Sequence, residues 1–149
     1  MRPRTTWVLV ADGARARAFA RQGVGGSLAA IPEGTFSHEV ERVADLGTDR
    51  PGRVRESANA AHHAIASRSD WRRDGKRDFA HRLAEWLEKG AHAHAYDHLV
   101  LVATPRTLGD FRDALGPEAR ERLSGELAKD LTAQPVAAIE AHLLRAQLI

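Results

Sequence analysis

The sequence predicts an α/β (α+β) fold: a mixed β-sheet of about five strands with helices packed on the sheet. Three observations predict this class. Short apolar and β-branched runs, typical of strands, occur in both halves of the chain. Segments with helical periodicity alternate with such runs in the second half. The length of 149 residues fits one domain, 1–149, large enough to bury a core. The expected order is β-β-β-loop-α-β-α-β-α.

The chain begins with a predicted β-hairpin. Residues 6–11, TWVLVA, are apolar and β-branched, as in a buried strand. Asp12 and Gly13 follow, a dipeptide that favours a type I′ turn, in which both central residues take positive φ. The second strand, residues 14–21, alternates alanine with mostly long arginine side chains, so one of its faces is expected to be polar.

A third strand and a long basic loop are expected next. The glycine-rich turn at residues 22–26 leads to a strand over 27–36, with a bulge at 32–34. Over residues 37–74 the hydrophobic periodicity fades, and turn formers and arginines dominate, so we expect a loop there. A loop of that length inside a domain is more often functional than filler.

The second half of the chain begins with a predicted helix from Gly75 to His94. Its apolar residues recur at helical spacing. They are Phe79, Leu83, Trp86, Leu87 and Gly90. A buried strand follows over 97–103. Thr104 then supplies an N-cap hydroxyl before Pro105, which predicts a helix that runs to about Leu115.

The last elements are short. Residues 116–117, Gly-Pro, end that helix and start a helical turn through about Arg122. Residues 123–131 alternate leucine with polar or small residues, which we interpret as an edge strand, with a helix as the alternative. Residues 134–135, Gln-Pro, open a final helix. Its expected apolar face consists of Val136, Ile139, Leu143 and Leu144.

Composition excludes several classes of site. Because the chain has no cysteine, it has no disulfide framework, thiolate zinc site or cysteine nucleophile. It shows neither an apolar run long enough to span a bilayer nor a signal peptide, so we expect a cytoplasmic location and no membrane partner. His81 and Glu85 have the i, i+4 spacing of metal ligands but no third ligand, so we expect no metal and no cofactor. The oligomeric state is left open.

Positive charge is concentrated in the middle of the chain. The formal net charge is only +2, yet 19 of the 22 basic residues are arginine, whose planar guanidinium suits phosphate and carboxylate. Residues 50–77 contain eight basic and three acidic residues, whereas 110–149 contain five basic and seven acidic residues. The arginines have two possible explanations, a role in binding anions and the codon usage of a GC-rich genome. The distribution of the arginines along the chain separates these explanations better than their total number does.

Three stretches of the chain carry a family resemblance. They are TWVLVADGARARAF at 6–19, LGTDRPGRVRES at 46–57, and HLVLVATPRTLGDFRDAL at 98–115 followed by LAKDLT at 127–132. In order and spacing they resemble the bacterial host attachment proteins, described as required for attachment to host cells. With the helix between them, the stretches cover nearly the whole chain.

The resemblance implies a fold similar to the middle domain of archaeal and eukaryotic class-1 release factors and of Pelota, among the RNase H-like sheets. In release factors the loop after the third strand carries a Gly-Gly-Gln tripeptide that helps water to cleave peptidyl-tRNA. Residues 37–74 contain neither this tripeptide nor any glutamine, which argues against that reaction.

The basic loop is the first candidate site. Pro51 and Gly52 predict a tight turn that projects the neighbouring arginines, which suit RNA phosphates. The candidate anion- or nucleic-acid-binding residues are Arg50, Arg53, Arg55, Arg72, Arg73 and Arg77. Trp71 is available for base stacking. The alternatives are a solvated loop with scattered charge and pairing of these arginines within the chain.

The secondary candidates are Asp12, Thr104 and Arg106. Asp12 ends a strand near the place where RNase H-like nucleases hold a metal-binding carboxylate, although a hairpin turn also accounts for it. Thr104 and Arg106 follow a central strand and begin a helix, a place that favours anions in open sheets. An N-cap is the alternative role for Thr104.

The sequence thus predicts a non-catalytic RNA- or ribosome-associated binding module, similar to a release-factor middle domain without the Gly-Gly-Gln motif. The expected partners are tRNA or ribosomal RNA. One alternative is a hydrolase that acts on an ester or phosphodiester at the Arg-rich loop, with His62 or His63 as base. The other is a protein-interaction factor with an indirect role in host-cell attachment. No catalytic residue is assigned.

Overall fold

A five-stranded mixed sheet with helices on both faces forms the structure, a computed structural model that describes residues 3–37 and 58–149, and side chains over 3–37 and 73–149. The strands are β1 (Thr5–Ala11), β2 (Arg15–Gln22), β3 (Ala29–Ser37), β4 (His98–Ala103) and β5 (Leu123–Ala128). The helices are α2 (Ala58–His92), α3 (Pro105–Ala114), α4 (Pro117–Arg122) and α5 (Val136–Arg145). The predicted fold class is confirmed.

The strand order is β3-β2-β1-β4-β5. β1 pairs antiparallel with β2 and parallel with β4, and β4 pairs parallel with β5. The edge strand predicted over 123–131 is therefore confirmed in its first part, and the helical alternative is wrong. Val10 pairs with Val102, and Ala103 pairs with Ala128. β1, β4 and β5 thus end together, at what we name the C-terminal edge of the sheet.

The β1–β2 hairpin is held by a side chain. The amide of Asp12 donates to the carbonyl of Arg15 at 2.9 Å, and Asp12 Oδ1 accepts from the amides of Ala14 and Arg15, each at 2.7 Å. Neither Asp12 nor Gly13 is among the described residues with positive φ, so the predicted type I′ turn is wrong. The carboxylate bridges the two amides instead, which stabilises the turn without the left-handed backbone conformation.

The predicted bulge in β3 is confirmed. Arg17 pairs with Thr35 and Phe19 with Ala30, so residues 31–34 all lie opposite Ala18. The excess residues bend the edge strand.

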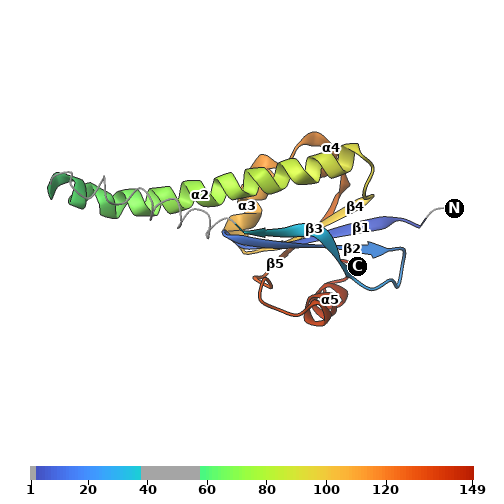
Figure 1. Ribbon diagram of the computed structural model, residues 1–149. Helices are drawn as coiled ribbons and strands as arrows, with labels where there is room; N and C mark the ends of the chain where they lie inside the picture. The colour runs from blue at the N-terminus through green and yellow to red at the C-terminus, as the bar shows by residue number, and fades with distance from the viewer. Residues whose placement is uncertain (1–2, 38–57) are drawn as a thin grey trace.

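Helices cover both faces of the sheet: α2, α3 and α4 lie on one face, and α5 lies on the other (Figure 1). Alternation along β1 explains the two cores, because Leu9 packs under α2 while Val8 and Val10 pack under α5. Of the predicted apolar face of α5, Ile139 and Leu143 are buried. Val136 and Leu144 are exposed, so that part of the prediction is wrong.

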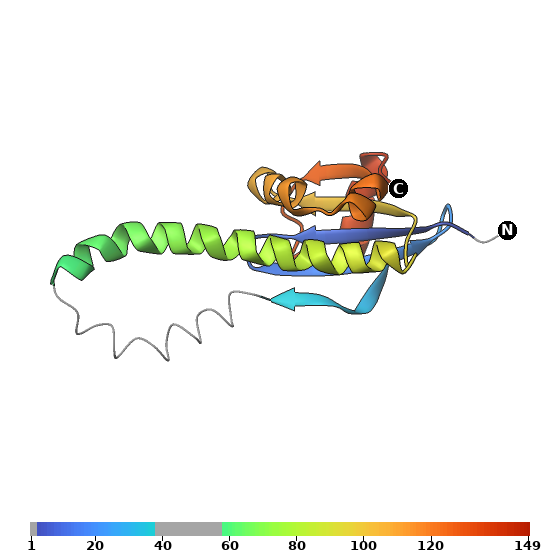
Figure 2. The same cartoon turned by 90° about the horizontal axis from the view of Figure 1, so that it is seen from above.

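Helix α2 begins at Ala58, not at Gly75. The loop predicted over 37–74 is therefore wrong for residues 58–74, and residues 38–57 lie outside the described residues. The run ANAAHHAIA at 58–66 favours a helix through alanine propensity. Its hydrophobic periodicity fades because this part of α2 projects beyond the C-terminal edge, where it has no sheet to pack on (Figures 1 and 2).

Aromatic rings stack between β1 and the C-terminal half of α2. The ring centroid of Trp7 lies 4.8 Å from that of Trp86 and 4.6 Å from that of Tyr96. Gly90 allows this approach, since a Cβ added there would lie 2.9 Å from the indole of Trp7. A glycine within a helix is thus explained by the close packing of a ring.

We expect Gly90→Ala to lower the free energy of unfolding by about 1–3 kcal/mol, because the Trp7 ring must move. Gly109→Ala in α3 is the matched control, since no atom lies within 4 Å of the added Cβ. That variant should gain about 0.5–1 kcal/mol from helix propensity alone. Urea unfolding followed by circular dichroism measures both, and a stability gain in both variants would contradict this packing.

Candidate functional site

The C-terminal edge of the sheet brings together side chains from three strands and from α2. Asp12 follows β1, Thr104 follows β4 and Lys129 follows β5. Lys76 of α2 reaches the same edge, because its side-chain carbons lie 2.6–2.7 Å from where a Cβ on Gly13 would stand. In open sheets covered by helices, this edge is where ligands bind.

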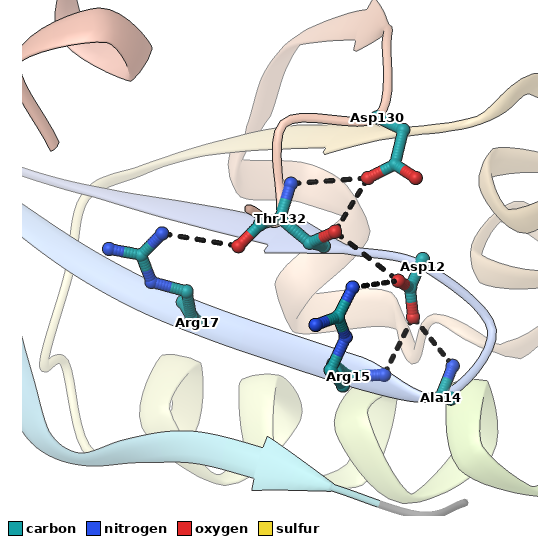
Figure 3. Close-up of polar contacts among 6 residues, drawn as sticks. All are labelled: Asp12, Ala14, Arg15, Arg17, Asp130 and Thr132. Atoms are coloured by element: carbon teal, nitrogen blue, oxygen red, sulfur yellow. Dashed lines mark hydrogen bonds and ion pairs between the residues drawn. The ribbon is translucent and has the colours of Figure 1, made fainter. Parts of the chain in front are cut away.

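Asp12 lies at the centre of a polar network (Figure 3). Its Oδ1 accepts the two hairpin amides, and its Oδ2 lies 3.2 Å from Thr132 Oγ1 and 3.4 Å from Arg15 Nη2. Thr132 is buried, and its hydroxyl also lies 2.6 Å from Asp130 Oδ1. Since Asp130 also accepts the amide of Thr132 at 3.1 Å, the segment after β5 is held in one conformation.

Arg17 joins the same network from β2. Its Nη1 donates to the carbonyl of Thr132 at 3.2 Å and to the carbonyl of Gln134 at 2.6 Å. These bonds join the β1–β2 hairpin to the connection between β5 and α5. Two stretches near opposite ends of the sequence therefore form one rigid corner of the edge.

The environment of Asp12 fixes its charge. Burial alone would raise the pKa of Asp12, but hydrogen bonds from the Ala14 and Arg15 amides, the charge of Arg15 and the Thr132 hydroxyl together hold this pKa below its usual value of 3.8. A lowered pKa favours the ionised carboxylate. The hydrogen bonds of Asp12 hold the backbone of the hairpin turn in place.

Four of the six arginines predicted to bind anions cannot be placed at the side-chain level. Arg50, Arg53 and Arg55 lie outside the described residues, and Arg72 lies in α2 with its side chain outside the described ones. Arg77 is exposed, 3.8 Å from the carboxylate of Asp74, also an exposed side chain.

Arg73 forms an ion pair within the fold. Its Nη1 donates to Asp110 Oδ2 at 2.8 Å, and its Nη2 donates to Asp110 Oδ1. Asp110 belongs to α3 and is buried. Arg73 therefore joins α2 to α3 through an ion pair within the chain, which was one of the alternatives for these arginines. Its guanidinium is bound to Asp110.

The secondary candidates lie at the C-terminal edge. Thr104 is the N-cap of α3, with its Oγ1 accepting the amide of Thr107 at 3.4 Å, and Pro105 occupies the first helical position, as predicted. Arg106 is exposed in the first turn of α3. Among the described residues, no group of three or more potential ligand side chains could hold a metal ion.

Arg17, Asp130 and Thr132 were not predicted as site residues. Their signal lay in two of the family stretches, ADGARAR and LAKDLT, which the fold brings into contact at Asp12 and Thr132. Spacing alone does not reveal this contact, because the two residues are far apart in the sequence.

Comparisons with known proteins agree with those stretches. The family model described as "Protein required for attachment to host cells" matches residues 7–143. No curated protein matches the chain. Over residues 3–37 and 58–149, no helix has both the length and the apolar character needed to cross a membrane. Because the family match extends from β1 into α5, the chain belongs to the family of proteins required for attachment to host cells.

Proposed function

We propose that this protein is a non-catalytic RNA-binding module that contacts the phosphates of tRNA or ribosomal RNA at the C-terminal edge of the sheet. One observation carries the proposal: exposed cations of three elements lie at this edge. Arg15 begins β2 beside the hairpin turn, Lys76 of α2 reaches Gly13, and Arg106 lies in the first turn of α3. Arg77 follows Lys76 in α2 and is also exposed. Arginine and lysine at one edge supply the phosphate contacts that dominate affinity for RNA.

These cations remain available to a ligand. Arg15 and Arg77 lie near carboxylates, but both side chains are 58% exposed. Within the described part of the chain, neither Lys76 nor Arg106 forms an ion pair. Exposed ion pairs contribute little free energy, so a phosphate can replace the carboxylates beside Arg15 and Arg77.

Helix α2 carries further basic positions. Positions 68 and 72, both arginine, precede Lys76 by two turns and one turn, so the three positions share one side of the helix. The first half of α2 projects past the sheet (Figure 2). Basic positions spread along a helix and a sheet edge suit a polyanion better than a small ligand. The resemblance to release-factor middle domains supports the same class of partner by analogy of fold.

We expect the double variant Lys76→Glu/Arg106→Glu to bind fluorescently labelled tRNA at least about tenfold more weakly than the wild type, because two phosphate contacts become repulsive. The matched control is Arg4→Glu/Lys89→Glu. This control makes the same change in net charge, but near the opposite end of β1. Arg4 directly precedes β1, and Lys89 is next to Gly90, which packs against the Trp7 ring.

Fluorescence anisotropy at fixed salt measures both affinities, after circular dichroism has shown that each variant folds. The control should bind nearly as the wild type does. Equal losses in the two double variants would mean that binding follows net charge alone, and the proposal would fail.

A further inference from the structure

A second group of basic side chains lies between the end of β5 and helix α5. His142 Nδ1 lies 3.4 Å from Lys129 Nζ and 3.2 Å from Arg145 Nη2. Lys129 directly follows β5, while His142 and Arg145 belong to the last turn of α5. Side chains from two elements, each able to carry positive charge, therefore converge on one ring nitrogen.

This group contains more donors than acceptors. Lysine and arginine side chains have no acceptor, and Nδ1 of a neutral imidazole has a single lone pair. The carbonyls of His142, Leu143 and Leu144 at the helix end accept the amides of Ala146, Leu148 and Gln147. Within the described part of the chain, the side-chain contacts of Lys129 and Arg145 are with the ring of His142 and not with these carbonyls.

Positive charges surround the imidazole ring of His142. Burial and the positive charges of Lys129 and Arg145 hold the pKa of His142 below its usual value of 6.5. Two carboxylates close to this group in sequence have other partners: Asp130 accepts the hydroxyl of Thr132, and Glu140 accepts the amide of Leu28. Within the described part of the chain, none of the three side chains forms an ion pair.

We propose that Lys129, His142 and Arg145 form a binding site for a tetrahedral oxyanion, of the class of phosphate, phosphomonoester and sulfate. Such an anion offers several oxygens, so each of the three side chains can donate to a different one. Protonated His142 contributes a donor and a charge. Oxyanion binding and protonation of His142 therefore strengthen each other.

This site uses cations other than those of the proposed RNA contact. The RNA-binding cations of α2 and α3 belong to helices on one face of the sheet, whereas His142 and Arg145 belong to α5, which covers the other face (Figure 1). Lys129 itself lies at the C-terminal edge. Neither proposal depends on the other, and each has its own variants.

Sulfate is the first probe, because it stays dianionic from about pH 5 to about pH 8 and any pH dependence then belongs to the protein. Sodium sulfate is titrated against the full chain at constant ionic strength while NMR follows the histidine rings. We expect saturable shifts at His142, a rise of its pKa by about one unit, and about fivefold tighter binding near pH 5.5 than near pH 7.5. His92, whose side chain is 64% exposed beside Glu88, serves as the internal control.

Lys129→Gln and Arg145→Gln should each weaken sulfate binding at least about fivefold, and Lys89→Gln should leave it unchanged. A parallel titration with glycerol phosphate distinguishes two kinds of ligand. Tighter binding of glycerol phosphate than of sulfate would indicate that the site takes a phosphomonoester, and equal binding would indicate that it takes a free oxyanion. The proposal is overturned if millimolar sulfate leaves the His142 resonances unmoved, or if both glutamine variants bind as the wild type does.

Discussion

Asp110→Ala should lower the free energy of unfolding by about 3 kcal/mol, the largest loss that we expect from a single polar substitution in this chain. Asp110 is buried in α3 and accepts two hydrogen bonds from Arg73 of α2. Without the carboxylate, the guanidinium stays in a partly buried position and loses both hydrogen bonds, and only the weaker influence of the Asp74 charge remains. Urea unfolding at neutral pH gives the value.

A double-mutant cycle separates the pair from its parts. Arg73→Ala leaves Asp110 unpaired, whereas Arg73→Ala/Asp110→Ala leaves no uncompensated charge, so the double variant should be less destabilised than the sum of the single ones. Arg77→Ala, whose nearest carboxylate is 3.8 Å away on exposed Asp74, should change stability by less than about 0.5 kcal/mol. Strictly additive losses would show that Arg73 and Asp110 are not coupled.

Asp12→Ala should lower the free energy of unfolding by about 2 kcal/mol, because the amides of Ala14 and Arg15 lose their acceptor. The loss should depend on pH. The pKa of Asp12 is lower in the folded state than its usual value of 3.8, so the unfolded chain takes up this proton more readily as the solution is acidified. The stabilisation from Asp12 is therefore complete above about pH 4 and is lost as the pH falls through the folded-state pKa.

Unfolding midpoints of the wild type and Asp12→Asn at about pH 6 and about pH 3 measure this effect. The difference between the two proteins should shrink at the lower pH. Asp113→Asn is the control, an exposed carboxylate of α3 whose removal should leave the acid dependence as it is in the wild type. A gap between wild type and Asp12→Asn that is constant with pH would contradict the assigned network.

Local signals in the sequence predicted the local structure well. The Thr104 cap with Pro105 and the bulge opposite Ala18 follow from capping and turn chemistry that acts over a few residues. The edge strand after Arg122 follows from the alternation of leucine with polar or small residues. The start of α2 was missed because hydrophobic periodicity reports a buried face, and the first turns of this helix project past the sheet.

The candidate site depends on contacts that no spacing rule contains. Charge counting selected Arg73 as a ligand-binding residue, yet its guanidinium pairs with Asp110, a partner supplied by tertiary packing. Likewise, Asp12 predicts a turn from its neighbour Gly13, while its bond to Thr132 depends on how the end of β5 returns to β1. The family stretches carried that information without the physical reason for it.

The salt dependence of tRNA binding tests the central proposal most directly. Each phosphate contact contributes about 0.7–0.9 to the slope of log affinity against log salt concentration. We predict a steep fall in affinity for the wild type, and a slope shallower by about 1.4–1.8 for Lys76→Glu/Arg106→Glu, but not for Arg4→Glu/Lys89→Glu. Wild-type affinity that does not change with salt, or equal slopes in all three proteins, would contradict RNA binding at the C-terminal edge.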